Sequence, residues 1–467
     1  MQAAPKQISN KSPHRTARAV PLRVSEAAGR KPSGADQDSI IAPSREFKMK
    51  NDDKRKLTPR LRFPEFRDQD GWEEKPLKAI CEINPQNGGL PDSFIYIDLE
   101  SVESGVLNTR KRIEKADAPS RAQRLLRNGD VVFQIVRPYQ RNNLFVRFDD
   151  NESYVASTGY AQLRAHDCES FLYQSVHAYP FVDRVIAKCT GSSYPAINSS
   201  DLAEVCLPVP PSPAEQQKIA DCLTSLDEVI VAQGRKVEAL KAHKKGLMQQ
   251  LFPREGETLP RLRFPEFRDA PEWKPTSLDE LVDIQSGGTP SKANPAFWNG
   301  SIPWASAKDM KTLFLEDTED HISVAAVDNG SRLVPAGTLL MLTRGMTLLK
   351  DVPICVIRRE MCFNQDVKAL QPKVDVDGLF LAFLLLGNKQ RLLKMVDIAG
   401  HGTGKLNTDE LKALELVSPQ PSEQQQIADC LSALDARIAA EADKLAALKT
   451  HKKGLMQQLF PSPEGMA

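Results

Sequence analysis

The chain has 467 residues, of which 41% are hydrophobic and 26% charged, and its formal net charge is +1. This length exceeds what one ordinary hydrophobic core supports, so two or three domains are expected. The composition is that of a globular protein, and the balanced charge requires any nucleic-acid surface to be local. No run of eighteen apolar residues occurs, which argues against a membrane-spanning helix.

The sequence offers no recognisable catalytic chemistry. The eight cysteines are scattered without a CxxC pair, which favours reduced thiols and a cytoplasmic location over disulfides or zinc. The N-terminus lacks the apolar core of a signal peptide. No HExxH, Gly-x-Ser-x-Gly or clustered metal ligands are present. The Gly-rich stretch 400–406 fails the spacing of a phosphate-binding loop and is interpreted as a turn. These absences predict a binding protein with no metal site and no catalytic residue.

Residues 1–56 form a basic leading tail in the sequence. They hold 13 Lys/Arg and 6 Asp/Glu, a net charge of +7, and they lack apolar periodicity. This composition predicts a disordered, solvated extension. A basic arm that binds DNA is the alternative interpretation.

The strongest sequence feature is an internal repeat. PRLRFPEFRD occurs at 59–68 and again at 260–269, and HKKGLMQQLFP occurs at 243–253 and again at 451–461. EQQKIADCLTSLDEVI (215–230) is echoed by EQQQIADCLSALDARI (423–438). Between these matched ends, segments 73–210 and 274–418 differ from each other. Matched ends with unlike middles predict a symmetric scaffold that presents two different readers.

Each unlike segment is predicted to be a mixed α/β domain with short strands. Strand-like runs occur at 94–97 and 131–136 in the first segment, and at 339–342 and 352–357 in the second. A Gly-containing turn precedes the second run of the first segment and the first run of the second, and Arg137 and Arg344 follow those two runs.

Residues 215–251 and 423–459 are predicted to be two long helices that pair as a coiled coil. Each shows a 3-4 apolar alternation for more than four heptads. Ser212 with Glu215, and Ser422 with Gln425, resemble N-terminal capping boxes, and Pro253 and Pro461 mark the ends. The seam residues are Ile219, Leu223, Leu226, Ile230, Gln233 and Leu240 in the first helix, and Ile427, Leu431, Leu434, Ile438, Glu441 and Leu448 in the second.

The polar seam residues Gln233 and Glu441 lie near the helix centres. If the helices pair antiparallel within one chain, these two side chains meet and fix the register. Homodimerisation through one helix is the competing interpretation.

Two groups of cations are candidate DNA contacts, because Lys and Arg neutralise phosphates and Arg, Asn and Gln bind base edges. Residues 105–147 carry 10 Lys/Arg and 3 Asp/Glu, whereas 275–418 carry 15 and 18. The candidates in the first segment are Arg110, Lys111, Arg112, Arg137, Tyr139, Gln140, Arg141 and Asn142. Those in the second are Lys308, Lys311, Arg344, Lys350 and Lys405.

The repeated helical motifs, together with Leu-Arg-Phe-Pro-Glu-Phe before each variable segment, resemble the specificity subunits of type I restriction–modification systems. The resemblance covers about residues 57–461. It implies an α+β protein with two target-recognition domains separated by two long antiparallel coiled-coil helices. After the tail predicted from composition (1–56), the implied organisation is a first target-recognition domain (57–211), a first helix (212–252), a second target-recognition domain (253–420, with its leading segment 259–273) and a second helix (421–461).

The resemblance also implies a function without catalysis in this chain. Such a subunit reads a bipartite, asymmetric sequence in double-stranded DNA and docks two modification (methyltransferase) subunits, with restriction subunits joining indirectly. S-adenosylmethionine, ATP and Mg²⁺ are then expected on those partners. A DNA-independent coiled-coil adaptor and an enzyme with an unrecognised active site are the alternatives.

Overall fold

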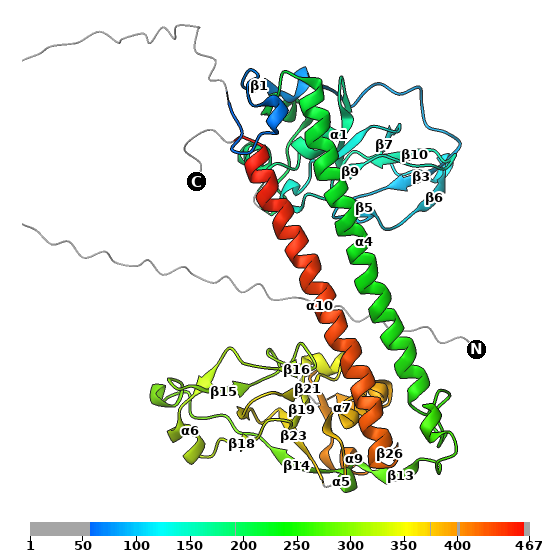
Figure 1. Ribbon diagram of the computed structural model, residues 1–467, viewed down its shortest axis with the longest axis vertical. Helices are drawn as coiled ribbons and strands as arrows, with labels where there is room; N and C mark the ends of the chain where they lie inside the picture. Colours follow the sequence, from blue (N-terminus) through cyan, green and yellow to red (C-terminus); the bar gives the residue numbers. More distant parts are fainter. Residues whose placement is uncertain (1–56, 192, 374, 399–401, 462–467) are drawn as a thin grey trace, which may run out of the picture. The chain divides into compact units, whose positions relative to one another are not determined.

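The computed structural model describes residues 57–191, 193–373, 375–398 and 402–461 (Figure 1). The predicted tail, residues 1–56, lies outside the described residues, as does part of the Gly-rich stretch 400–406.

Two helices of 39 residues dominate the fold, α4 (Pro213–Leu251) and α10 (Pro421–Leu459) (Figure 1). Each is roughly 58 Å long at 1.5 Å per residue. Ser212 caps α4, because its hydroxyl accepts a hydrogen bond from the Glu215 amide. The matching prediction for α10 is wrong: Gln420 is the N-cap residue without a side-chain bond, so Ser422 lies inside the first turn.

The two helices run antiparallel and are joined by three sets of polar contacts. Lys452 contacts both carboxylate oxygens of Asp227 at 2.6 and 2.7 Å. Lys244 makes the equivalent contact to Asp435 at 2.6 Å. Residue numbers therefore rise along one helix as they fall along the other, and the predicted antiparallel pair is confirmed.

Gln233 and Glu441 meet at the middle of the pair. The Gln233 amide donates to the Glu441 carboxylate at 2.7 Å and to the Glu441 main-chain oxygen at 2.9 Å. Lys236 also pairs with this carboxylate. The Gln233 amide first, and Lys236 second, hold the pKa of Glu441 below its usual range. A polar contact of this kind fixes which residues of the two helices face each other.

Burial varies along the seam. Ile219, Leu223, Ile427 and Leu431 are buried. The seam residues closer to the helix centres are half-buried: Leu226, Ile230, Leu240, Leu434, Ile438 and Leu448. The apolar seam is deepest where a domain packs over it, and near the middle the buried Val237 is accompanied by the polar contacts.

The first domain is built on two four-stranded sheets, β6-β3-β10-β7 and β2-β11-β8-β9, with two-stranded sheets β1-β12 and β4-β5. Its strands are β1 Glu73–Pro76, β2 Cys81–Ile83, β3 Ser93–Ile97, β4 Val102–Glu103, β5 Val106–Leu107, β6 Lys111–Glu114, β7 Ala122–Leu125, β8 Val131–Gln134, β9 Leu144–Phe145, β10 Tyr154–Ser157, β11 Tyr160–Ala165 and β12 Cys206–Val209. Its helices are η1 Pro64–Phe66, η2 Leu77–Ala79, η3 Lys115–Asp117, η4 Pro138–Gln140, α1 Glu169–Ser175, α2 Tyr179–Ala187 and α3 Ser199–Ala203.

The second domain has a five-stranded sheet, β14-β23-β19-β21-β16, a four-stranded sheet, β17-β15-β22-β18, and the smaller sheets β13-β26 and β20-β25-β24. Its strands are β13 Lys274–Ser277, β14 Val282–Ser286, β15 Ile302–Ala305, β16 Phe314–Leu315, β17 His321–Ile322, β18 Leu333–Val334, β19 Leu339–Leu342, β20 Arg344–Gly345, β21 Ile354–Ile357, β22 Met361–Phe363, β23 Val367–Pro372, β24 Val396–Ile398, β25 Gly404–Leu406 and β26 Glu415–Ser418. Its helices are η5 Pro265–Phe267, α5 Leu278–Leu281, η6 Pro295–Phe297, α6 Val324–Asp328, η7 Met346–Leu349, α7 Gly378–Gly387, α8 Lys389–Lys394 and α9 Thr408–Lys412.

Each domain core includes residues from both long helices. The first core contains Ile219 and Leu223 from the start of α4 with Met456 and Leu459 from the end of α10. The second contains Leu251 from the end of α4 with Ile427, Ala428 and Leu431 from the start of α10. Since the helices are antiparallel, the two domains are anchored at opposite ends of the pair.

A buried Arg–Glu–Trp contact, here called the clamp, fastens each repeated leading motif to a helix. Arg62 makes a two-pronged ion pair with Glu215 at 2.8 Å, and Trp72 donates to the same carboxylate at 3.1 Å. The Arg62 and Glu215 side chains are only 5% and 0% exposed. The second clamp repeats these contacts with Arg263, Glu423 and Trp273.

Each clamp also brings the leading motif to the end of the other helix. The Leu61 amide donates to the Gln458 oxygen at 3.0 Å, and the Leu262 amide donates to the Gln250 oxygen at 2.9 Å. Trp72 packs edge-on against Phe460, and Trp273 packs the same way against Phe252. The repeated PRLRFPEF motif therefore ties the start of one long helix to the end of the other.

Candidate nucleic-acid interface

A short loop after β8 gathers five of the predicted DNA-contacting residues. It comprises residues 137–142 and is called loop 1 here. Arg137 and Arg141 flank η4, and both adopt left-handed backbone conformations with φ of 55° and 56°. Non-glycine residues rarely adopt this conformation because it crowds Cβ against the backbone. Strain of this kind is typical of functional loops that the surrounding structure holds in place.

Both arginines of loop 1 stack on tyrosine rings. The Arg137 guanidinium carbon lies 4.3 Å from the centroid of Tyr194, and that of Arg141 lies 3.9 Å from the centroid of Tyr179. Tyr194 and Tyr139 are 65% and 50% exposed. Large exposed aromatic rings beside cations are typical of nucleic-acid surfaces, because both base faces and phosphates find partners there.

Buried amides hold loop 1 against its domain. The Gln134 side-chain amide donates to the side-chain oxygen of Gln140 at 2.8 Å. Its oxygen accepts from the main-chain N–H of Asn142 at 3.1 Å. The Asn143 side-chain oxygen accepts a hydrogen bond from the main-chain N–H of Gln134 at 2.8 Å. The Arg137 amide donates to the Pro195 oxygen at 2.7 Å, which joins loop 1 to the turn that precedes α3.

His177 extends this polar network towards the long helices. Its Nδ1 lies 2.7 Å from the Tyr173 oxygen, and its Nε2 lies 3.3 Å from the Asn143 amide nitrogen. This pattern fits a neutral imidazole, with the proton on Nδ1. Burial lowers the pKa of His177 to about 4, with further lowering from Lys452 and Arg141, against the opposing effects of the Tyr173 carbonyl and Asp227.

Acid is therefore expected to weaken the first domain. The folded-state pKa of His177 lies below the ordinary value of about 6.5, so the unfolded chain takes up the proton first as pH falls. The stabilisation is complete above about pH 6.5 and is lost as pH falls towards 4. Urea midpoints of the His177→Gln variant should depend less on pH between 7 and 5 than wild-type midpoints. His243→Gln, an exposed site on α4, is the control and should retain the wild-type pH dependence.

The corresponding part of the second domain contains β20, η7 and β25. Arg344 and Lys405 are neighbours across β20 and β25, and both are exposed, as is Lys350 at the end of η7. Exposed apolar side chains accompany them: Met346 is 63% exposed and Ile398, on β24, is 72% exposed. In register, Lys405 lies between Arg344 and Asp397, and Gly404 lies between Gly345 and Ile398. Because successive side chains of a strand point to opposite faces, Arg344 and Lys405 share one face and Ile398 lies on the other. Residues 344–350, 396–398 and 404–406 are together called loop 2 here.

The structure separates the remaining predicted contacts from these loops. Arg110, Lys111 and Arg112 lie on or next to β6, in a different sheet from β8. Arg110 pairs with Asp150 at 2.8 Å, and Arg112 pairs with Glu152. Carboxylates already neutralise these two cations.

In the second domain, Lys308 and Lys311 follow β15 and lie outside loop 2. Lys308 pairs with Glu319 at 2.7 Å and with Asp320 at 2.9 Å. These hydrogen bonds raise the pKa of Lys308 above its usual range. The cation is therefore stabilised by protein carboxylates.

Sequence reasoning did not identify Tyr179, Tyr194, Met346 or Ile398. Their proximity to the arginine loops depends on pairings such as Val136 with Ala196 and Arg344 with Lys405, which join segments about 60 residues apart. One available signal was the pair Asn198 and Asn407, which cap α3 and α9 and place the two turns in equivalent positions.

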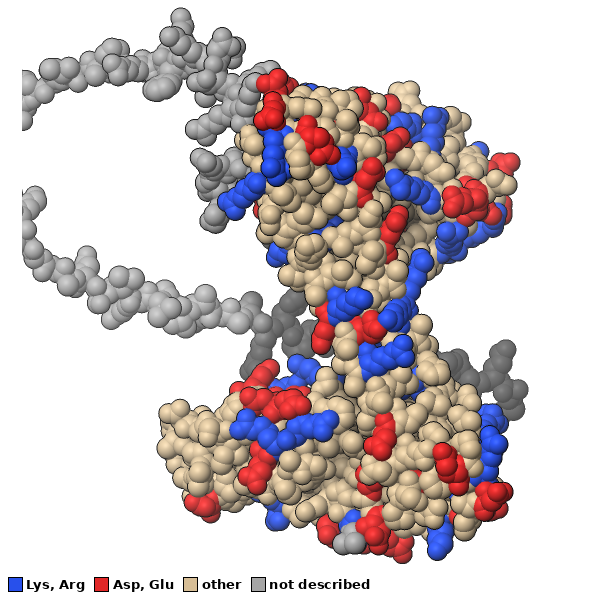
Figure 2. All heavy atoms as spheres, viewed as in Figure 1, with Lys and Arg blue, Asp and Glu red and all other residues tan. Residues whose placement is uncertain are grey.

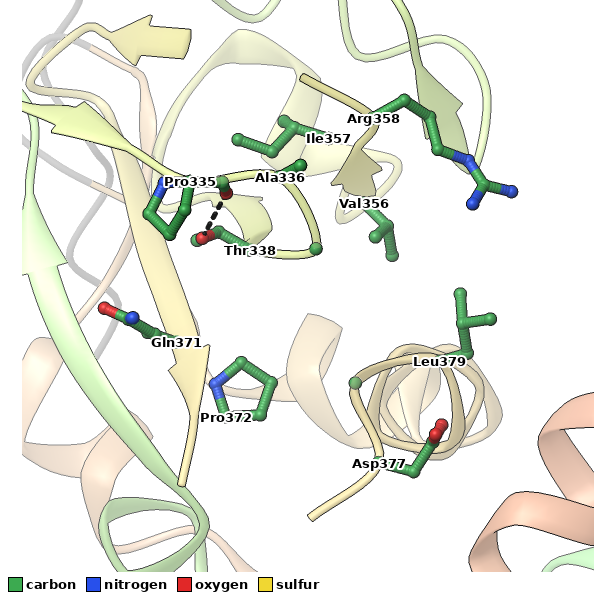
Figure 3. Close-up of a pocket in the computed structure, with 12 residues that line it drawn as sticks. Pro335, Ala336, Thr338, Val356, Ile357, Arg358, Gln371, Pro372, Asp377 and Leu379 are labelled. Atoms are coloured by element: carbon green, nitrogen blue, oxygen red, sulfur yellow. Dashed lines mark hydrogen bonds between the residues drawn. The ribbon is translucent and has the colours of Figure 1, made fainter. Parts of the chain in front are cut away.

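A hollow of about 480 Å³ lies at the opposite end of β19 from loop 2 (Figure 3). Its lining includes Thr338, Arg358, Gln371 and Asp377. Thr338 donates to the Pro335 oxygen, and Asp377 caps α7 by accepting from the Phe380 amide. Thr338 and Asp377 therefore each have a hydrogen-bond partner within the fold.

Charges are intermixed over the face seen in Figure 2, and no large single-sign patch appears there. Among the residues that the structure describes, no group of three or more His, Cys, Asp or Glu side chains is arranged to hold a metal ion. Within those same ranges, none of the helices combines the length and apolar character needed to cross a bilayer.

Two unlike α/β domains, anchored on a matched antiparallel helix pair, define a two-domain scaffold. The chain belongs to the family of the type I restriction modification DNA specificity domain, whose family model matches residues 69–241 and 271–450.

Individual proteins that the chain resembles are specificity subunits of type I restriction enzymes. The chain is 32% identical over 166 residues to the type I restriction enzyme EcoR124I/EcoR124II specificity subunit of Escherichia coli, a match that covers 35% of this chain and 41% of the relative. It is 23% identical over 403 residues to the HindI specificity subunit of Haemophilus influenzae, which covers 71% and 82%. The chain thus matches less than half the length of the first relative and most of the second.

Solved structures confirm the fold. The S subunit of a type I restriction–modification system from M. genitalium superposes with a TM-score of 0.54 at 14% identity, covering 87% of this chain and all of that one. A chain from a study of type I R-M complex assembly superposes with a TM-score of 0.53 at 23% identity, covering 84% and 98%.

Proposed function

We propose that this chain is the DNA-specificity subunit of a type I restriction–modification complex. It reads a bipartite, asymmetric target in double-stranded DNA through loops 1 and 2. It also docks the modification subunits and, through them, the restriction subunits. The observation that carries this proposal is the combination of matched helices and clamps with two chemically different loops.

The difference between the loops supports an asymmetric target. Loop 1 presents arginines and tyrosines, whereas loop 2 presents Arg344 and Lys405 with the exposed apolar side chain of Met346. Arginine suits guanine edges, and apolar side chains suit the methyl group of thymine. Two loops of different chemistry read two different half-sites.

The duplicated contacts of the helix pair support the docking of two identical partner subunits. The Lys–Asp contact of the helix pair and the clamp each occur twice, with the same residue types in both copies. Equivalent surfaces on the two helices suit two copies of one modification subunit. In this proposal the chain itself is not an enzyme. S-adenosylmethionine, ATP and Mg²⁺ are held by the partner subunits, and the complex works in the cytoplasm.

Mapping N6-methyladenine across the host genome, with the gene intact and deleted, tests the proposal. Deletion is expected to erase methylation at one motif with two unlike halves and a fixed gap, and reintroduction of the gene should restore it. If no motif changes, the chain is to be co-expressed with its modification subunit in a host lacking that methylation. Persistent absence of a new motif there would contradict the proposed function.

Purified protein distinguishes the alternative functions. The chain alone is expected to leave DNA unmodified and uncut when S-adenosylmethionine or Mg²⁺ is supplied. Modification or cleavage by the chain alone would instead identify an enzyme. Failure of the assembled complex to bind any duplex would favour an adaptor unrelated to DNA.

A further inference from the structure

A lysine of α10 lies beside loop 1 and is linked to it by an aromatic ring. The ammonium nitrogen of Lys453 lies 5.2 Å from the centroid of Tyr179, the ring on which Arg141 stacks at 3.9 Å. Tyr179 begins α2, which packs against η4 of loop 1. A residue of the long helix and a residue of the reading loop therefore share one small surface.

We propose that Lys453 contacts a DNA phosphate next to the half-site that loop 1 reads. The proposal rests on the proposed function and adds a contact from the helix pair itself. The long helix would then hold the duplex directly as well as support the domains.

This surface carries two positive charges, those of Lys453 and Arg141. Within the described ranges, neither Lys453 nor Arg141 forms an ion pair with a carboxylate. Lys452, the neighbour of Lys453, is by contrast paired with Asp227 at 2.6 Å. Two cations held at one ring repel each other unless an anion approaches both. Duplex DNA supplies that anion, with one charge per about 1.7 Å of its axis.

Lysine also fits a phosphate better than a base edge in this position. Its ammonium group is a compact charge on a flexible stem, whereas the arginine fork matches the two acceptors of guanine. Phosphate contacts position the protein without reading sequence. Lys453 should therefore contribute to affinity for every duplex and leave the recognised sequence unchanged.

The repeat provides a matched control. Lys245 occupies the position in the first HKKG motif that Lys453 occupies in the second. Lys244 and Lys452 make equivalent ion pairs with Asp435 and Asp227, and Lys244 also lies over the Phe383 ring. Lys453 lies over Tyr179, whereas among the described residues no such aromatic contact involves Lys245. If these lysines served to dock identical partner subunits, both would matter equally. A DNA contact tied to loop 1 should involve Lys453 more than Lys245.

The test measures binding of the complete complex, formed with its modification subunits, to two duplexes between 50 and 200 mM salt. One duplex contains the sequence that the complex methylates, and the other contains an unrelated sequence. With Lys453→Gln, the slope of log affinity against log salt should become shallower by about one on both duplexes. Lys453→Arg and Lys245→Gln should keep the wild-type slope, and the methylated sequence should not change.

Two results would overturn this inference while leaving the proposed function intact. One is a wild-type complex that prefers its target while Lys453→Gln keeps the wild-type slope. The other is a Lys453→Gln complex that loses its modification subunits, with Lys245→Gln behaving alike. A wild-type complex that does not distinguish the two duplexes would instead overturn the proposed function, and this inference with it.

Discussion

Replacing Glu215 by Gln should destabilise the first half of the molecule by about 3–5 kcal/mol. The Arg62 and Glu215 side chains are 5% and 0% exposed, so the substitution leaves a buried guanidinium without its anion. The Trp72 indole also donates to this carboxylate, and the loss therefore affects the aromatic contact that joins Trp72 to Phe460. Urea unfolding combined with hydrogen exchange measures both the size and the place of the effect.

The second clamp supplies the control. Glu423→Gln should produce a loss of similar size, because Arg263 and Glu423 are 9% and 1% exposed, but the reduced protection should fall in the second domain core. Replacing Arg62 and Glu215 together by Met and Leu should recover much of the stability, since no buried charge is then left unpaired. Wild-type stability of Glu215→Gln would show that the clamp does not hold the leading motif.

Removing the Arg141 side chain should weaken discrimination at one half-site only. A two-pronged arginine contact to a base is worth about 1–3 kcal/mol, so Arg141→Ala should weaken binding to the cognate duplex by roughly 5- to 150-fold. Affinity for unrelated duplexes should fall far less. Changing base pairs one at a time in a competition assay should show tolerance confined to the half read by loop 1, with the other half still discriminated.

Two further variants separate recognition from folding. Arg141 has φ of 56°, a conformation that Gly adopts without steric cost, so Arg141→Gly should keep the backbone of loop 1 and still lose the discrimination. Arg344→Ala should produce the complementary result, with tolerance confined to the half read by loop 2. If Arg141→Gly discriminates both halves normally, the assignment of loop 1 is wrong.

The long helices could be predicted from sequence because their determinants are local. A 3-4 apolar alternation that stops at a proline, Pro253 or Pro461, identified each helix. The contacts of the two helices are duplicated just as their sequences are. The clamp was not predicted, because Arg62 and Glu215 are 153 positions apart and nothing local marks a buried ion pair. The second cap was predicted wrongly because the Ser-x-x-Gln pattern also fits the first turn of a helix that begins at Pro421.

Charge alone could not define the recognition surface. Arg110, Arg112 and Arg141 are equally basic in the sequence, but acidic neighbours on the folded chain neutralise the first two. The aromatic partners of the remaining arginines come from segments about 40 to 60 residues away, so long-range pairing decides which cations remain available.

The central position of the helix pair is a neutral Gln233 in the first copy and an acidic Glu441 in the second, so the two halves differ in charge there. Lys244–Asp435 and Lys452–Asp227 are one contact made in exchanged copies, so a fragment with a single copy would carry both of its partners. Two first halves would oppose Gln233 with Gln233, and amides can both donate and accept. Two second halves would oppose Glu441 with Glu441, where carboxylates only accept and repel each other. A gene split between its copies should therefore yield a first half that pairs with itself more readily than the second half does.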